Sequence, residues 1–258
     1  MREQYIKDLY KHFNYYPTWL PGVPLELGDI GIIKNDEFTR ISSLKNEEIA
    51  FEVVEDTTKT PLEFASTGGV TVTTKLAGSA KLPGSNLEEI DAGFSVEFKK
   101  ERATLFKLKG TVSPSISDTI SLGKEILARY KKGEWEKDWV IITEVVKAES
   151  STIIVSSSND SKLELKSKAK VGTDALKLTD ASANFSIAYD KDVSLKFIAT
   201  GGLTPLFRVM GIKGFFKAGF GTKGGSGRGD FFSPIKMESN SGGESAPKFV
   251  EIKPNVED

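Results

Sequence analysis

Two stretches of the chain alternate apolar and polar residues with a period of two, and the second repeats the first at an offset of 91 residues. The clearest match aligns residues 92–98 with residues 183–189, and the same offset aligns Gly110 with Gly201 without a gap. A period of two is typical of a β-strand, because successive side chains point to opposite faces of the sheet. The chain is therefore predicted to contain two related β-hairpin units.

Each unit has one apolar face and one polar face that is rich in lysine. The first unit comprises a long strand over 70–82 and a second strand over 94–98, and the second unit comprises strands over 163–171 and 185–197. In one interpretation the apolar face covers a core and the lysine face meets solvent, as in many antiparallel sheets, and the alternation alone favours this. In the other, the strands rearrange into membrane-spanning β-strands, which need about 9–11 residues each.

Two helices and several shorter strands surround these units. Apolar residues at helical spacing predict an N-terminal helix over 3–15 and a central helix over 117–130, with Asp118 as its N-cap and Gly133 as its end. Further strands are expected at 29–33, 38–41, 51–54, 104–108, 139–142, 152–155 and 203–209. The predicted fold class is α+β and β-rich, a twisted antiparallel sheet with two long amphipathic hairpin units around a central helix, plus an N-terminal helix.

The composition changes after about residue 213. Residues 211–229 contain eight glycines, and residues 239–247 are rich in serine, glycine and asparagine. Segments of this composition bury little apolar surface. We predict a single β-rich body over 1–213, followed by a flexible Gly/Ser-rich tail over 214–258 as a candidate inhibitory segment.

Composition also removes most catalytic and metal-binding chemistry. The chain has no cysteine and one histidine, His12, which excludes disulfides, thiolate ligands and sites built on several histidines. We expect His12 to be a packing or surface residue, and we expect no enzymatic activity, catalytic residue, cofactor or metal. The N-terminus has no apolar signal segment, and no run approaches the roughly 18 apolar residues of a membrane-spanning helix, which predicts a cytoplasmic protein.

Charge is distributed unevenly along the chain. Residues 70–230 carry 25 basic and 19 acidic side chains, whereas residues 1–69 carry seven basic and 12 acidic ones. A basic region is attracted to anionic lipid or nucleic acid. Ordinary scatter of charges along a sequence is the alternative explanation.

Two segments resemble strands of the gasdermin pore-forming domain. Residues 139–146, Trp-Val-Ile-Ile-Thr-Glu-Val-Val, resemble its strand with two hydrophobic residues before Thr-Glu-Val-Leu. Residues 203–209, Leu-Thr-Pro-Leu-Phe-Arg-Val, are similar to its late strand, in which an aromatic residue precedes Arg-Val. The order of predicted elements over about residues 25–213 and the length of the chain are similar to those of the short gasdermins of bacteria and fungi.

This resemblance implies a membrane pore-forming effector in cell death or defence, which oligomerises into a β-barrel after release of autoinhibition. Its implied partners are anionic membrane lipids, further copies of the chain and an activating protease, and it would be membrane-associated when active; a nucleic acid is not expected. The implied membrane-inserting residues are Val70, Val72, Leu76, Phe94, Val96, Phe98, Leu163, Leu165, Phe185, Ile187 and Tyr189. The residues expected to contact lipid headgroups or line the pore are Lys166, Lys168 and Lys170.

We expect Leu165 and Ile187 to be buried in the form that precedes insertion. The alternative function is a soluble, non-enzymatic β-sheet binding module whose basic face engages another macromolecule.

Overall fold

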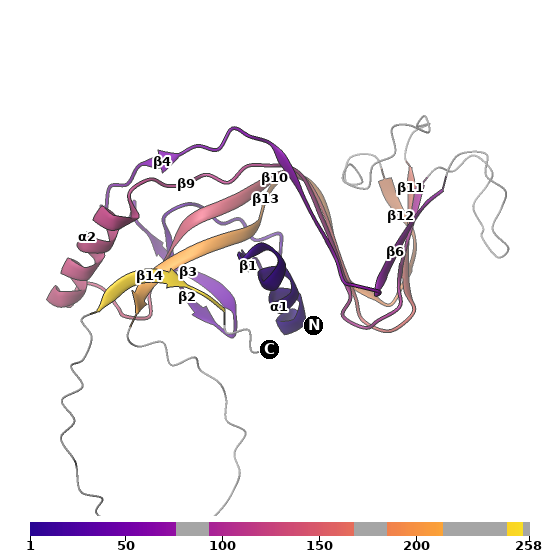
Figure 1. Ribbon diagram of the computed structural model, residues 1–258, viewed down its shortest axis with the longest axis horizontal. Coiled ribbons are helices and arrows are strands. Elements are labelled where there is room, and N and C mark those ends of the chain that lie inside the picture. The colour runs from indigo at the N-terminus through magenta and orange to yellow at the C-terminus, as the bar shows by residue number, and fades with distance from the viewer. Residues whose placement is uncertain (76–92, 168–184, 214–246, 255–258) are drawn as a thin grey trace, which may run out of the picture.

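The computed structural model describes residues 1–75, 93–167, 185–213 and 247–254, and these residues form two helices and two antiparallel sheets (Figure 1). The helices are α1 (Arg2–Phe13) and α2 (Thr119–Lys132). The strands are β1 (Tyr16–Pro17), β2 (Asp29–Lys34), β3 (Glu37–Ser43), β4 (Val53–Val54), β5 (Thr60–Ala65), β6 (Val70–Lys75), β7 (Gly93–Phe98), β8 (Thr104–Thr111), β9 (Ser115–Ile116), β10 (Val140–Ser156), β11 (Ser161–Ser167), β12 (Phe185–Lys191), β13 (Val193–Lys213) and β14 (Lys248–Ile252). The predicted β-rich α+β class is confirmed.

Local signals in the sequence account for both helices. The Asp118 carboxylate accepts hydrogen bonds from the backbone N–H groups of Ile120 and Ser121 at 3.1 and 2.8 Å, so it caps α2 as predicted. Gly133 ends α2 in the left-handed conformation, with φ 76°. Asn14 ends α1 in the same way, slightly before the predicted end of that helix.

The ten-stranded sheet is organised around β10 and β13, which contain 17 and 21 residues. They pair along their length, from Val140 opposite Gly211 to Ser156 opposite Val193. The other edge of β10 pairs with β2, β9 and β8 in turn, and these pair with β3, β4 and β5. The sequence predicts two separate strands in place of each of these long strands, because polar and glycine residues interrupt the alternation. In the structure each strand is continuous, and the interruptions are β-bulges.

The two predicted hairpin units form the second sheet, in which the strands lie in the order β12–β11–β7–β6. The repeat is visible in the structure, because an offset of 91 residues relates β6 to β11, β7 to β12, and β8 to the start of β13. Gly110 and Gly201, which this offset aligns, share the left-handed conformation with φ values of 62° and 65°.

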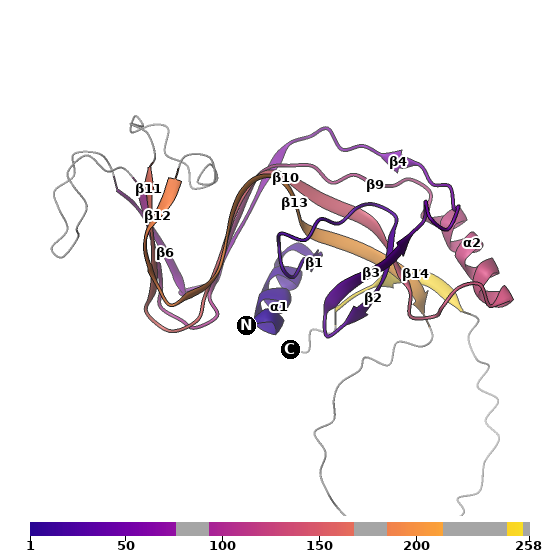
Figure 2. The same ribbon diagram turned by 180° about the vertical axis from the view of Figure 1, so that it is seen from behind.

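The described residues form three parts, called the limb, the arm and the body (Figures 1 and 2). The limb is the four-stranded sheet. The arm is the part of the large sheet formed by β5, β8 and residues 150–156 and 193–200 of β10 and β13. The body is the remainder of the large sheet together with α2, which lies at the end of the body far from the limb (Figure 1). The central helix in the sequence therefore does not contact the hairpins.

The C-terminal strand corrects the predicted domain boundary. β14 pairs antiparallel with the end of β13, from Val209 opposite Ile252 to Lys213 opposite Lys248. The ring of Phe249 lies against α2 so closely that a Cβ atom at Gly123 would be 3.0 Å from its Cδ1. The prediction of a flexible tail is therefore wrong for residues 248–252, which add a strand to the sheet beside β13. The rest of the predicted tail, 214–246 and 255–258, lies outside the described residues.

Candidate functional site

The structure brings the predicted membrane-inserting residues of both hairpins into one sheet. β7 and β11 pair with each other, which places Val96 opposite Leu163 and Phe94 opposite Leu165. β6 adds Val72 opposite Val96 on the far side. Residues 67 and 71 positions apart in the sequence are therefore paired in the limb. Of the predicted set, Leu76, Lys168 and Lys170 lie outside the described residues.

The limb and the arm are two halves of one four-stranded ribbon. The arm has the strand order β5–β8–β10–β13, and these strands continue through short turns into β6, β7, β11 and β12, which lie in the same order. The ribbon turns back on itself along a single line, which we call the crease (Figure 1). The crease comprises residues 66–69, 99–103, 157–160 and 192.

Every turn of the crease contains one residue with positive φ. These residues are Gly68, Arg102, Asp160 and Asp192, with φ values of 63°, 62°, 58° and 55°. For a residue other than glycine this conformation costs about 1–2 kcal/mol. Hydrogen bonds from serine hydroxyls help to offset that cost, because Ser156 donates to the carbonyl oxygen of Lys100 at 2.8 Å and Ser161 donates to that of Asp192 at 2.7 Å.

An apolar core, which we call the limb core, lies between the limb and the arm. The limb contributes Phe94, Val96, Phe98, Leu163 and Leu165, and the other side contributes Ala103, Leu105, Ile154 and Val193. All of these side chains are at most 7% exposed. The ribbon therefore buries its apolar face against itself. The alternating pattern identified the limb half of this core but not the arm half, although the 91-residue offset also relates β8 to β13.

The predicted residues differ in how deeply they are buried. Val70 is half-buried and packs against the limb core, whereas Val72, Ile187 and Tyr189 are 38%, 50% and 47% exposed. The expectation that Ile187 is buried is therefore wrong, because β12 is an edge strand of the limb. Leu165, its expected companion, is buried as predicted. Phe185 lies at the start of β12, opposite Ser167.

A β-bulge changes the face on which Tyr189 lies. β11 and β12 pair with Leu165 opposite Ile187 and Glu164 opposite Tyr189, so Ala188 is an extra residue in β12. An extra residue reverses the alternation beyond it. Tyr189 consequently shares the charged face with Glu164, and the prediction that it belongs to the apolar set is wrong.

The charged face of the limb carries both signs of charge. Lys162 Nζ lies 3.1 Å from a Glu164 carboxylate oxygen and 3.3 Å from one of Glu97. The hydrogen bond to Glu164 is the main reason that the pKa of Lys162 is raised. Lys166 is half-buried on the same face, opposite Gly93 of β7. In the described part of the limb, the predicted basic face is thus partly neutralised.

The two segments that resemble gasdermin strands are neighbours in the sheet. Glu144 on β10 lies opposite Arg208 on β13, and their side chains form an ion pair at 3.3 Å. The Tyr15 hydroxyl donates to the Glu144 carboxylate, and the Arg208 guanidinium lies 4.2 Å above the centre of the Tyr15 ring. Burial and this hydrogen bond raise the pKa of Tyr15 to about 12. This cluster joins the loop after α1 to the body.

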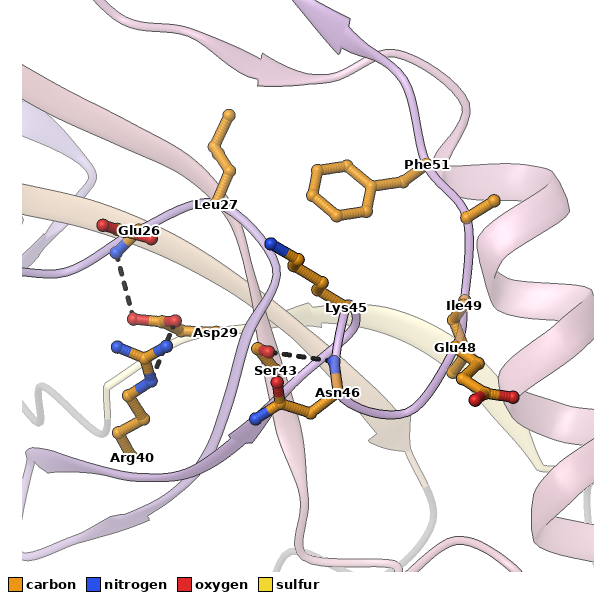
Figure 3. Close-up of a pocket in the computed structure, with 11 residues that line it drawn as sticks. Glu26, Leu27, Asp29, Arg40, Ser43, Lys45, Asn46, Glu48, Ile49 and Phe51 are labelled. Carbon is orange, nitrogen blue, oxygen red and sulfur yellow. Dashed lines mark hydrogen bonds and ion pairs between the residues drawn. The ribbon is translucent and has the colours of Figure 1, made fainter.

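A pocket of about 770 Å³ lies on the body beside the β2–β3 hairpin (Figure 3). Its Asp29 carboxylate is 1% exposed, lies 3.1 Å from Arg40 Nε and accepts a hydrogen bond from the Glu26 backbone N–H. Burial raises the pKa of Asp29. Glu48 and Lys45 also line the pocket, so acidic and basic groups are mixed. This arrangement selects no class of ligand, and the residues predicted for function lie elsewhere.

His12 is exposed on α1, with its ring 4.6 Å from that of Phe13 and 5.2 Å from that of Phe64. In the described part of the chain, no three His, Asp or Glu side chains are grouped as metal ligands. Within the same residues, neither helix has the length and apolar character needed to cross a bilayer. No protein-family model and no curated protein matches the chain, so the gasdermin resemblance stays a prediction.

Proposed function

We propose that this chain is a membrane pore-forming protein, similar to gasdermins, whose creased ribbon opens and inserts into a bilayer. The observation that carries the proposal is the limb core, in which both apolar layers belong to one ribbon. Opening the crease would place these layers end to end on one face. β7 and β8 contain six and eight residues on either side of the crease, and a membrane-spanning β-strand needs about 9–11.

In the limb half of an opened ribbon, the two faces would suit lipid and water. The inner faces of limb and arm, with Phe94, Leu165 and Ile154, would form the lipid-facing side. The opposite side of the limb carries Lys162 and Glu164 and would line an aqueous pore. The arm half of that opposite side is apolar and is covered by α1.

The proposal is also supported by the edge strands, which could pair with further copies of the chain, and by the C-terminal strand, which could control that assembly. In the described part of the ribbon, β5 and β6 lie at one edge and β12 and residues 193–203 lie at the other, each paired on one side. Unpaired edges of this kind add further copies of a chain by strand pairing, and pairing between unlike edges generates rings. β14 is joined to β13 only through residues 214–247 along the chain, so a protease acting there would allow it to dissociate.

Dye release from vesicles tests this function. The full chain, carrying an inserted site for a specific protease within residues 214–246, is added to vesicles with anionic or neutral headgroups before and after cleavage. We expect release from anionic vesicles only after cleavage. Binding without release would contradict pore formation and favour the binding-module interpretation, and the uncleaved chain with protease-treated vesicles is the control.

A further inference from the structure

A second line of irregularities crosses the ribbon where the arm meets the body, and we call it the shoulder. It comprises Pro61 on β5, Gly110 on β8, Glu149 on β10 and residues 201–202 on β13. At each position the pairing register shifts or the pairing stops, so the ladder hydrogen bonds are interrupted in all four strands. The arm bends away from the body along this line (Figures 1 and 2).

Helix α1 lies in the inner corner of this bend (Figures 1 and 2) and packs against both sides of it. Its residues Tyr5, Ile6 and Leu9 are at most 2% exposed. They share one apolar core, which we call the α1 core, with residues on both sides of the shoulder. These are Val146, Ala148 and Leu206 on the body side, and Phe106, Leu108, Ile153, Val155 and Leu195 on the arm side. A single rigid helix therefore connects the two segments that meet at the shoulder.

Further contacts attach α1 to each segment separately. On the body side, Arg2 Nη1 lies 2.9 Å from a carboxylate oxygen of Glu37, on β3. On the arm side, the rings of Phe13 and Phe106 lie 5.5 Å apart, and the Ser194 hydroxyl donates to the Met1 sulfur at 3.2 Å. The helix is thus attached near both of its ends and along its apolar face.

We infer that α1 is a conformational restraint that holds the arm bent at the shoulder and has to leave the arm before the ribbon straightens. Straightening would move the arm side of the α1 core away from the body side, so α1 keeps its contacts with only one of them. Because α1 is also attached to the body by the ion pair of Arg2 and by the chain that follows it, the arm contacts are the ones that are lost. The consequence at a membrane rests on the proposed function, whereas the restraint itself does not.

The distance between body and arm tests the restraint directly. The chain has no cysteine, so spin labels can be placed at Ile120→Cys on α2, where the side chain is 72% exposed, and at exposed Lys99→Cys in the crease. Leu9→Ala removes part of the α1 core, and Ile142→Ala on β10 is the matched control in the body, since both side chains are 0% exposed and Ile142 packs with neither α1 nor α2. We expect Leu9→Ala, or the milder Ile6→Val if Leu9→Ala unfolds, to broaden the distance distribution measured by electron paramagnetic resonance. A distribution that is unchanged, or that broadens equally in the control, would overturn the inference.

Cross-linking tests whether α1 has to leave the arm. His12 and Glu101 line one groove between α1 and the crease, so the double variant His12→Cys/Glu101→Cys, treated with a short bis-maleimide, holds α1 on the arm. The control pair Arg2→Cys/Glu37→Cys holds α1 on the body. We expect the first cross-link to abolish dye release by the cleaved chain and the second to preserve it.

Release despite the first cross-link, or loss of release with both, would overturn the inference about α1. No release from the cleaved chain without any cross-link would contradict the proposed pore function instead. In that case the label distances still determine whether α1 restrains the arm.

Discussion

The core between limb and arm and the core beneath α2 are equally well buried but differ in how they are assembled. Every residue of the limb core belongs to the ribbon or to its crease. The core beneath α2 combines residues of β2, β9, α2, β10 and β13 with Leu44, Ile49 and Trp135, and Phe249 of β14 packs against it. Opening of the limb core would require a movement at one line of turns, whereas opening of the core beneath α2 would require several elements to separate. Burial alone does not distinguish a permanent core from one that can open.

The largest expected effect comes from a charge inside the limb core. Leu165 is 2% exposed among apolar side chains, so Leu165→Asp places a carboxylate where water is excluded. We expect it to lower the free energy of unfolding of the limb by at least about 4 kcal/mol, measured by urea denaturation. A loss below about 1 kcal/mol would show that the limb core is open to water in solution.

Removing a large side chain from each core separates local from global unfolding. Phe98→Ala in the limb core is expected to cost about 3–5 kcal/mol, and Ile126→Ala beneath α2 about 2–5 kcal/mol. In hydrogen-exchange mass spectrometry, Phe98→Ala should increase exchange in β6, β7 and β11 and leave α2 protected, whereas Ile126→Ala should increase exchange in α2 and β14. Uniform increases in both variants would mean that the two cores unfold as one unit.

The two glycines related by the repeat provide a smaller, matched pair. Alanine at Gly201 meets no atom nearer than 4.0 Å, so Gly201→Ala should cost only the strain of its left-handed backbone, about 1–2 kcal/mol. Alanine at Gly110 would place its Cβ atom 2.1 Å from a carboxylate oxygen of Glu149, and it would disturb the ion pair of Glu149 with Lys59. We expect Gly110→Ala to cost about 0.2–1 kcal/mol more.

The control is Glu149→Ala added to each glycine variant, followed by thermal denaturation. It should remove the difference between the two glycines. Persistence of that difference would show that the two copies of the repeat differ at the shoulder for a reason other than Glu149.

Alkaline pH should destabilise the body through Tyr15. The pKa of Tyr15 is raised to about 12 by burial and by its hydrogen bond to Glu144, whereas a tyrosine in an unfolded chain ionises near pH 10. The folded state therefore keeps this proton longer, and the contribution of Tyr15 to stability is complete below about pH 10 and lost as the pH rises towards 12. Urea denaturation across this range should show a smaller decline for Tyr15→Phe. An identical decline in both proteins would contradict the assignment to Tyr15.

The smallest effect on stability is expected at an exposed limb residue, and it isolates function from folding. Ile187 is 50% exposed, so Ile187→Asp should change the free energy of unfolding by no more than about 0.5 kcal/mol. The same carboxylate on a lipid-facing strand opposes insertion, and we expect dye release to be lost. Ile41→Asp on β3 is the control, since Ile41 is also 50% exposed but lies on the body. Equal release by both variants would contradict insertion of β12.

Sequence patterns predicted the elements whose signals are local. The cap at Asp118, the stop at Gly133 and the alternation along β7 and β11 each depend on neighbouring residues, and each is present in the structure. The strand β5 was missed because Pro61 and Glu63 interrupt its apolar residues. The reversal of face at Tyr189 was missed because a bulge depends on how β12 pairs with β11 rather than on β12 itself.

The sequence by itself determined the apolar faces of β7 and β11, the cap and the end of α2, and the presence of two copies of one unit. Only the tertiary structure decided that the limb folds back over its own arm, that α1 spans the shoulder and that β14 completes the sheet. The physical reason is that a strand pattern specifies an apolar face without specifying what covers it. After a turn of a few residues the chain can continue or reverse. Which of these it does is determined by the packing of residues far apart in the sequence into one core, such as Phe94 and Ile154.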